Sequence, residues 1–537
     1  MHARAAPSPS PCNRLAGPQA GAARAQVSRR GAERTCSEST RLSARPREGE
    51  EEGAHGAFDL VGVGAAMRPM LLRRYVEHAL YARQHGYFAA KHVVGGLRSS
   101  QPLPYAELRD EDHYRRTVRE RTETGADGSA WLTPSETFTP HYGEAVARSI
   151  VERHRVRYPD GTPLQLLEVG GGNGTFARDV LTYLRRDEPE LYSSCRYMVV
   201  EISAALHAAQ RTCLGEALGD EHLASRVELV NDDARTWAAA RPGSLTGPWN
   251  ICMLEVLDNL GHDRLRVTQP RGGDPPVLQQ AVVHCLDEEN GFELPSDAGG
   301  QVSSDASFAA RSADAQGGER ALWQQNFEPL TDTDLLDVSS LLGLTSLDAL
   351  VELRAEVAAA EGAGVGASLA SDVQSFFGSL LGESGRDGVA DTIDVHVPTG
   401  SWRLLSALCA AAPTHEFTMA DFSWLPPQPD GAIGAPVVQV QRAGTTIDLR
   451  GDYLRACGDA DILFPTNFGH LATMVDAASR ASRGAGGAPP RPAATLSTAE
   501  FMRRWHTAGA TRTASGFDPL TDDFANTAFL LSSADAE

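Results

Sequence analysis

The fold of this chain is decided by the stretch Leu166-Leu167-Glu168-Val169-Gly170-Gly171-Gly172-Asn173-Gly174-Thr175. A short apolar run ends here in a glycine-rich turn, and a helical pattern follows the turn. Glycine at position 170 permits the positive φ of a tight strand-to-helix turn. Glycines at 172 and 174 leave the backbone open to a ligand. The helix beginning at Thr175 offers unpaired N–H groups and the positive end of its dipole, which suit an anionic group.

Short apolar runs and helical patterns alternate around this turn. Strands are predicted at Leu164–Val169, Tyr197–Ile202, Val227–Val230 and Trp249–Leu254, and helices at Thr175–Arg186 and Ala204–Leu218. Such alternation is typical of βαβ units and a parallel sheet, and continuous apolar strands indicate that both sheet faces are covered. We therefore expect a doubly wound α/β fold, with Phe417–Phe422 and Val437–Gln441 as further strands of the same sheet.

The spacing of the glycines narrows the class of ligand. A dinucleotide fingerprint needs Gly-x-Gly-x-x-Gly, whereas the glycines here are Gly170, Gly172 and Gly174. The lysine of a phosphate-binding P-loop is absent from the turn. The acidic Glu168 would repel a pyrophosphate but suits the ammonium group of a methionine moiety. This combination indicates S-adenosylmethionine, with a tight turn that binds nothing as the alternative.

Acidic residues also end the next two predicted strands. Glu201 can bind both hydroxyls of a ribose, because it ends the strand that neighbours the turn. Asp232 and Asp233 end the third strand, where one carboxylate could accept from the adenine amino group and the other would cap a helix. The sequence does not decide which of the two residues has which role.

Two further acids, Glu255 and Asp258, follow the fourth strand and would lie beside the reacting methyl group. Two carboxylates can bind a guanidinium in its forked geometry. The sequence therefore predicts both as catalytic residues. In the alternative interpretation Glu255 only caps a helix and Asp258 is solvated.

These motifs resemble the mitochondrial complex I assembly factor 7 family, also called the MidA or DUF185 methyltransferases. The resemblance rests on Glu168–Thr175, on Val200-Glu201-Ile202-Ser203 and on Glu255 with Asp258. Weaker blocks lie at His85-Gly86-Tyr87-Phe88, Thr133-Pro134-Ser135-Glu136 and Ala420-Asp421-Phe422, so the resemblance covers about residues 67–535. It implies a Rossmann-like class I methyltransferase sheet, S-adenosylmethionine as cofactor, and symmetric dimethylation of an arginine on a core complex I subunit.

The chain departs from the family pattern in several places. The usual Gly-Pro-Gly turn is Gly170-Gly171-Gly172, and the usual Asn-Glu-Phe-Phe-Asp is Leu254-Glu255-Val256-Leu257-Asp258. The Asp-Val-Asp-Phe segment is replaced by Pro465-Thr466-Asn467-Phe468. The chain therefore resembles a divergent plant-and-fungus-type branch.

Composition divides the chain into five predicted regions. They are a transit peptide with a disordered segment (1–66), an N-terminal helical cap (67–160), the methyltransferase core (161–477), a linker (478–497) and a C-terminal unit (498–537). The Gly/Ser/Ala/Asp-rich stretch at 288–320 and the Ala/Gly-rich stretch at 359–369 are predicted to be surface insertions.

Charge and composition limit the partners and the location. With 49 basic and 70 acidic residues the net charge is -21, which disfavours nucleic acid as a partner. No apolar run is long enough for a transmembrane helix. The eight cysteines lack metal-ligand spacing, so we expect no metal site. Residues 1–47 carry nine Arg and two acids, a composition that is typical of a transit peptide. We expect import into the mitochondrial matrix. The alternatives are import into a chloroplast and a disordered basic tail.

The preferred function is therefore protein arginine methyltransfer that supports complex I assembly, with a protein substrate. A small-molecule methyltransferase and a non-catalytic assembly chaperone of the same fold are the alternatives. The sequence leaves the oligomeric state open.

Overall fold

The computed structural model describes most of the chain from residue 69 onward. The described residues are 69–82, 86–90, 94–95, 102–122, 131–272, 274–286, 322–364, 391–442, 445–456, 458–483 and 492–532. They all fall within one compact unit, Leu60–Glu537. The predicted transit peptide, residues 1–66, and the stretch 288–320 lie outside the described residues.

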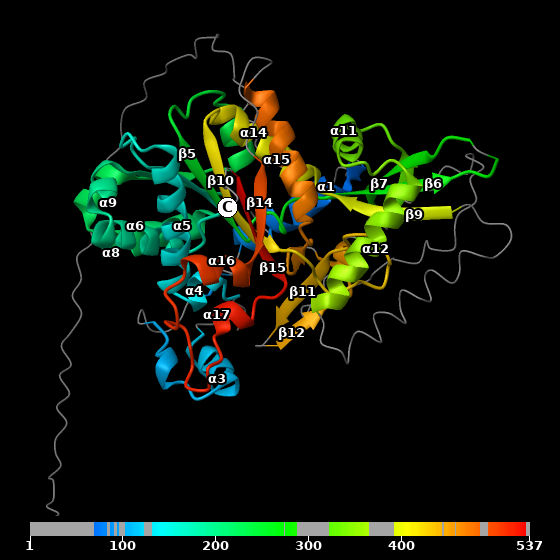
Figure 1. Cartoon of the computed structure of the whole chain (residues 1–537). Coiled ribbons are helices and arrows are strands. Elements are labelled where there is room, and N and C mark those ends of the chain that lie inside the picture. The colour runs from blue at the N-terminus through cyan, green and yellow to red at the C-terminus, as the bar shows by residue number, and fades with distance from the viewer. Residues whose placement is uncertain are drawn as a thin grey trace, which may run out of the picture. The chain divides into compact units, whose positions relative to one another are not determined.

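A seven-stranded sheet forms the centre of this unit (Figure 1). Its strands are β2 (Gln165–Val169), β3 (Arg196–Glu201), β4 (Val227–Asn231), β5 (Trp249–Leu254), β10 (His415–Phe422), β14 (Ala493–Ser497) and β15 (Thr527–Ser532). The spatial order is β14-β15-β10-β5-β2-β3-β4, or 6-7-5-4-1-2-3 when the strands are numbered along the chain. Read from the other edge, this order is 3-2-1-4-5-7-6. The parallel strands are β2, β3, β4, β5 and β10, and β15 runs antiparallel to both of its neighbours. The predicted doubly wound α/β sheet is confirmed.

Helices cover both faces of this sheet, because neighbouring residues on each strand point to opposite sides. On β2, for example, Leu166 and Leu167 belong to different hydrophobic cores. One face packs against α5 (His141–Arg157), α6 (Thr175–Asp187) and α8 (Ala204–Leu218), and the other against α10 (Ala234–Ala239), α14 (Thr399–Ala411) and α15 (Phe468–Arg483). Two covered faces explain the continuous apolar strands of the sequence.

A second, antiparallel sheet lies between β5 and β10 in the chain, and the sequence analysis did not predict it. Its strands are β6 (Asp263–Gln269), β7 (Val277–Leu286), β8 (Leu322–Pro329) and β9 (Asp391–Val397), with β1 (Met70–Leu71) paired to β7. Two helices accompany it, α11 (Thr333–Leu341) and α12 (Leu347–Gly364). Figure 1 shows this sheet on the opposite side of the main sheet from α6, α8 and α9.

A third sheet corrects one prediction. The strand predicted at Val437–Gln441 exists as β11 (Val437–Arg442), but it pairs with β12 (Thr445–Asp448) and β13 (Asp461–Leu463) rather than with the main sheet. An apolar strand pattern predicts extended backbone but does not specify the partner strand. The placement of β11 in the main sheet was therefore wrong.

The segment before β2 contains helices that pack in different places. They are α1 (Leu72–Tyr81), α2 (Tyr87–Ala90), α3 (Glu111–Arg121), α4 (Pro134–Thr137) and α5, with a 3-10 turn at Tyr105–Glu107. Helix α1 packs against the second and third sheets, whereas α5 covers the main sheet. None of the described helices is both long enough and apolar enough to cross a bilayer.

Two segments predicted to be flexible contain regular structure. Helix α12 continues to Gly364, into the Ala/Gly-rich stretch 359–369. Within the predicted linker 478–497, α15 continues to Arg483 and β14 begins at Ala493. Alanine favours helix, so these Ala-rich ends extend elements that are anchored by packing. The remaining elements are α7 (Pro189–Ser194), α9 (Asp220–Arg226), α16 (Thr498–Trp505), α17 (Pro519–Asp522) and a 3-10 turn at Tyr453–Arg455.

Candidate active site

The glycine-rich turn has the positive φ value that the sequence predicts at Gly170, and the same holds at two further glycines. Gly170, Gly172 and Gly174 have φ values of 72°, 51° and 87°, which favour glycine at all three positions. A Cβ on Gly174 would lie 3.0 Å from the Cα of Gln210 on α8. Helix packing and a positive φ therefore both favour glycine at position 174.

A cavity of about 430 Å³ opens at the carboxyl ends of β2, β3, β4 and β5. Open α/β sheets bind their ligands at this edge. The predicted site residues that line it are Gly170, Gly172, Glu201, Asp232, Asp233, Glu255 and Asp258. The turn and the acidic strand ends, which are up to 88 positions apart in sequence, are thus brought together in one cavity.

Glu168 and Thr175 line a smaller adjoining cavity of about 50 Å³. The two cavities share Gly170, Gly172 and Glu255 in their walls. Gly174 lines neither cavity, since its role is in packing.

The smaller cavity carries buried acids. The hydroxyl of Tyr197 donates to Glu168 Oε2 at 2.8 Å, and burial raises the pKa of Glu168 to about 7. Glu136, which the sequence analysis did not choose as a site residue, accepts from Asn173 Nδ2 at 3.2 Å and also lines this cavity. Two carboxylates in a small enclosed space suit an ammonium group.

Glu201 ends β3 with its carboxylate held from behind. Oε1 accepts the backbone N–H of Ser203 at 2.9 Å, and Oε2 accepts from Gln210 Nε2 at 3.3 Å. Burial raises its pKa to about 7, and the hydrogen bonds oppose this shift. The backbone N–H groups of Gly172 and Ile202 also donate to this carboxylate, and Glu201 lines the cavity.

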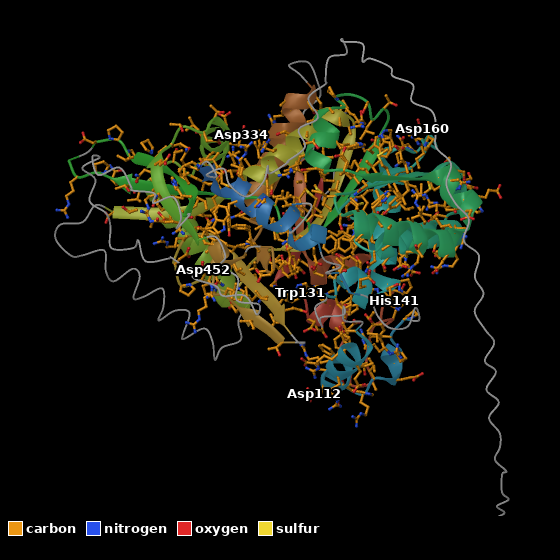
Figure 2. All side chains as sticks on the ribbon, turned by 180° about the vertical axis from the view of Figure 1, so that it is seen from behind. Asp112, Trp131, His141, Asp160, Asp334 and Asp452 are labelled. Atoms are coloured by element: carbon orange, nitrogen blue, oxygen red, sulfur yellow. The ribbon has the colours of Figure 1, made fainter. Side chains whose placement is uncertain are left out.

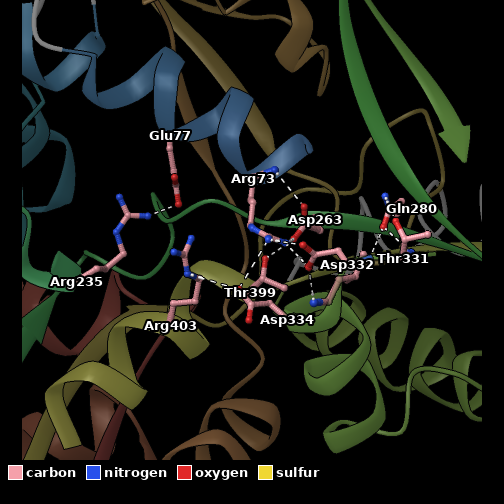
Figure 3. A network of polar contacts seen from close by, with 11 residues as sticks. Arg73, Glu77, Arg235, Asp263, Gln280, Thr331, Asp332, Asp334, Thr399 and Arg403 are labelled. Atoms are coloured by element: carbon pink, nitrogen blue, oxygen red, sulfur yellow. Dashed lines mark hydrogen bonds and ion pairs between the residues drawn. The ribbon is translucent and has the colours of Figure 1, made fainter. Parts of the chain in front are cut away.

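The structure separates the roles of Asp232 and Asp233, which the sequence left open. Asp233 caps α10 by accepting the backbone N–H of Arg235 at 2.9 Å, and it also pairs with the Arg235 guanidinium at 2.7 Å. Arg235 pairs in addition with Glu77 of α1 (Figure 3). Among the described residues, the Asp232 carboxylate accepts only the backbone N–H of Asp233, at 2.8 Å. Asp232 is therefore the residue of the two that can bind a ligand.

The same region of α1 is anchored to the second sheet. Figure 3 shows Arg73 between Asp263 and Asp332. The Arg73 guanidinium pairs with the two carboxylates at 2.6 and 2.7 Å. Burial of these ion pairs fixes α1, which ends at Tyr81 in the cavity wall. A helix from the N-terminal segment thus forms one side of the site.

Glu255 has an unusual backbone conformation at the end of β5. Its φ is 54°, a left-handed conformation that is costly for a residue other than glycine. The backbone N–H of Glu255 donates to the carbonyl of Ala420 at 2.9 Å, which holds the turn in place. Burial, followed by the charges of Asp421 and Asp461, raises the pKa of Glu255 to about 8.

Asp258 is 1% exposed, and its Oδ1 atom has no hydrogen-bond partner in the described part of the chain. Burial and the neighbouring acids Asp421 and Asp461 raise its pKa well above the usual value. The alternative of a solvated Asp258 is therefore wrong, because the side chain is buried in the cavity wall.

Two acids near this pair were not chosen from the sequence. Asp421 ends β10, and its Oδ2 accepts the backbone N–H groups of Leu257 and Asp258. Asp461 begins β13 and lines the cavity. Asp421 could have been found as another acidic strand end, whereas no local pattern marks Asp461.

Aromatic side chains form another part of the cavity wall. Tyr81, Phe88 and Trp131 line the cavity, and the Tyr81 and Phe88 rings stack with centroids 5.6 Å apart. Trp131, labelled in Figure 2, donates from Nε1 to the hydroxyl of Tyr87 at 2.6 Å. Within the described residues, no three His, Cys, Asp or Glu side chains are grouped as a metal site requires.

Residues 145–333 match the model of a protein family described as "Putative S-adenosyl-L-methionine-dependent methyltransferase". This part of the chain is similar to that family. The matched stretch contains the glycine-rich turn, Glu201, Glu255 and Asp258, so the resemblance expected from these motifs is confirmed. The matched segment is similar to S-adenosylmethionine-dependent methyltransferases, and S-adenosylmethionine is the cofactor that the glycine-rich turn also indicates.

A curated relative is the "Protein arginine methyltransferase NDUFAF7 homolog, mitochondrial" of Schizosaccharomyces pombe. It is 24% identical over 128 residues, which are 23% of this chain and 26% of that protein. The chain described here thus matches about a quarter of the length of this relative.

Two solved structures of COG1565 superfamily proteins from Burkholderia thailandensis are also similar to this chain. The one bound to S-adenosyl-homocysteine has a TM-score of 0.45 and 15% identity, and the match covers 86% of this chain and 88% of that chain. The native structure has a TM-score of 0.44 and 14% identity, and the match covers 87% of this chain and 88% of the other.

Proposed function

We propose that the chain transfers methyl groups to an arginine side chain of a protein. The observation that carries this proposal is the charge of the cavity wall. Of the described residues that line it, six are acidic (Glu201, Asp232, Asp233, Glu255, Asp258 and Asp461) and one, Arg235, is basic. Arg235 is already paired with Glu77 and Asp233. A wall of this charge favours a cationic acceptor.

The residues present fit the cofactor. The N–H groups and positive-φ glycines of the turn leave its backbone accessible, Glu201 can bind the ribose hydroxyls, and Asp232 can accept from the adenine amino group. Glu168 and Glu136 suit the ammonium group of the methionine moiety. When bound, S-adenosylmethionine supplies an electrophilic methyl group.

Glu255 and Asp258 are the proposed catalytic residues. Both follow β5 and line the cavity, where two carboxylates can hold a guanidinium and direct one nitrogen towards the methyl group. A guanidinium nitrogen must lose a proton when it is methylated. Burial raises the pKa of Glu255 to about 8, which makes its ionised form a stronger base, and a bound guanidinium favours that ionised form.

The finer assignment is symmetric dimethylation of a core subunit of respiratory complex I in the mitochondrial matrix. It is supported by the family resemblance of the motifs and by the name of the Schizosaccharomyces pombe relative. A reporter fused to residues 1–66 that enters chloroplasts instead of mitochondria would contradict this location and leave the methyltransferase assignment intact.

Mass spectrometry of complex I subunits from cells with and without this protein tests the acceptor. We expect symmetric dimethylarginine on a core subunit only when the protein is present. Unchanged arginine methylation, together with methyl transfer to a metabolite by the purified chain, would indicate a small-molecule acceptor instead.

A further inference from the structure

Asp461 lies in the wall of the cavity, although it is far in sequence from the other acids there. It begins β13 of the small three-stranded sheet, about 200 residues after β5, and it lines the same cavity as Glu255 and Asp258. Its side chain is 6% exposed. A carboxylate from a different sheet therefore completes the acceptor end of the cavity.

Hydrogen bonds join β13 to the segment that carries the two proposed catalytic acids. Asn259 Nδ2 donates to Asp461 Oδ1 at 2.8 Å and to the carbonyl of Ile462 at 3.0 Å. In return, the backbone N–H of Phe464 donates to the carbonyl of Asp258 at 2.8 Å. Asp461 and Asp258 are thus held in a fixed arrangement, as preorganised binding groups require.

No protein cation neutralises these acids within the described part of the chain. None of the ion pairs found there includes Glu255, Asp258 or Asp461. Oδ1 of the buried Asp258 also lacks a hydrogen-bond partner. Burial of unpaired carboxylates is costly, so a site of this kind gains stability when a cation with several N–H donors enters.

The aromatic wall has the same preference. The Tyr81 hydroxyl donates to the carbonyl of Asn259 at 3.2 Å, which places its ring beside the acidic segment, and Phe88 stacks on that ring. Faces of aromatic rings attract cations. A flat cation with donors at its edge can therefore contact the aromatic faces and the carboxylates together.

We propose that Asp461 is a third acceptor-binding carboxylate, which with Glu255 and Asp258 makes this end of the cavity selective for a guanidinium by charge. The inference rests on the proposed function and deepens it, because it adds a specificity residue from outside the matched family segment, residues 145–333. Shape alone would not distinguish a guanidinium from its neutral urea isostere, whereas three carboxylates would.

The experiment compares methylguanidinium with methylurea as ligands of the full chain in the presence of S-adenosyl-homocysteine, at constant ionic strength, by calorimetry. We expect the wild type to bind methylguanidinium at least tenfold more tightly than methylurea. Asp461→Asn keeps an oxygen that can accept from Asn259 and removes the charge. It should weaken methylguanidinium binding about tenfold and leave the affinity for S-adenosyl-homocysteine within about twofold.

Asp448→Asn is the matched control, because Asp448 lies in the same small sheet, on β12, and is exposed outside the cavity. It removes the same charge and should leave the preference for methylguanidinium unchanged. If Asp461→Asn does not fold, Asp461→Ser offers a second neutral variant, and a thermal melt with S-adenosyl-homocysteine verifies either protein.

Two results would overturn the inference. One is a wild type that binds methylguanidinium and methylurea equally, and the other is a folded neutral variant that keeps the full preference. The outcome is independent of the proposed acceptor protein. A preference that depends on Asp461, found without any methylarginine in cells, would uphold the cation site and refute arginine methylation of a protein.

Discussion

Asp421 holds Asp258 in position through the backbone, since Asp421 Oδ2 accepts the Asp258 N–H at 3.2 Å and the Leu257 N–H at 2.9 Å. Asp421 Oδ1 accepts the N–H of Phe422 at 2.8 Å. A side chain at the end of β10 thus organises the loop that follows β5, its parallel neighbour. The role of Asp421 is positioning, because this loop carries both proposed catalytic acids.

Replacement of Asp421 tests this role. Asp421→Ala leaves buried N–H groups without an acceptor, each at a cost of about 1–3 kcal/mol, and should lower both thermal stability and methyl transfer. Asp421→Asn keeps one acceptor oxygen and should preserve more of both. Thermal melts and a transfer assay measure the two effects. Equal losses in the two variants would show that the charge of Asp421, not its acceptor role, matters.

Gly172→Val tests the glycine-rich turn. A β-branched residue is strained at a φ of 51°, so the turn should shift and the affinity for S-adenosylmethionine should fall at least tenfold in calorimetry. Gly161→Val is the control, because Gly161 has a φ of 80°, has open space around it and lies outside the cavity. It should cost similar stability without loss of cofactor affinity. Unchanged affinity in Gly172→Val would contradict the placement of the cofactor.

The left-handed backbone of Glu255 should make the glycine variant more stable than the alanine variant, which is the reverse of the usual order. Both variants remove the carboxylate, but Glu255→Gly relieves the strained φ and should be about 1 kcal/mol more stable than Glu255→Ala in denaturant unfolding. At Asp258, which is not among the described residues with positive φ, the alanine variant should be the more stable one. Neither glycine variant should transfer methyl groups at the wild-type rate. The same order at both positions would contradict the strain at Glu255.

Buried acids make the stability of the free protein depend on pH. Burial raises the pKa of Glu255 to about 8 and those of Glu201 and Asp461 to about 7, above their values in the unfolded chain. The folded state therefore binds more protons between about pH 4.5 and 8, and stability falls as pH rises through this range. Thermal melts at pH 5 to 8.5 should show this fall, and Glu255→Gln should reduce it.

Glu500→Gln is the control for the pH series. Hydrogen bonds from Ser497 lower the pKa of Glu500, so its contribution is lost only at more acidic pH. The slope between pH 5 and 8.5 should stay as in the wild type. A flat wild-type profile would mean that the cavity acids titrate normally.

The double variant Glu255→Ala and Asp258→Ala separates an enzyme from an assembly chaperone. Loss of either carboxylate should reduce transfer tenfold or more, since each factor of ten is about 1.4 kcal/mol of barrier. The affinity for S-adenosylmethionine should change little, because Glu201 and Asp232 lie at the cofactor end. The measurement is rescue of complex I assembly in a null strain. Full rescue by a stable double variant would indicate a scaffold.

Local patterns in the sequence determined the part of the structure that binds the cofactor. The strands β2 to β5, the helices α6 and α8, and the turn conformation at Gly170 and Gly172 follow from apolar runs, helical spacing and glycines that are close in sequence. Because parallel strands present their carboxyl ends at one edge, Glu201, Glu255 and Asp258 were also predictable as neighbours.

Only the tertiary structure decided the acceptor end. The arrival of Asp461 beside Asp258 and the support from Asp421 depend on contacts between residues more than 160 positions apart. The sheet that β11 joins depends on pairing with β13, a strand that no local pattern in β11 specifies. The choice of Asp232 over Asp233 depends on Arg235, whose second partner lies on α1. Local hydrophobic patterns carry no information on such pairings, because burial selects for apolar strands without specifying which strand or charge will lie opposite.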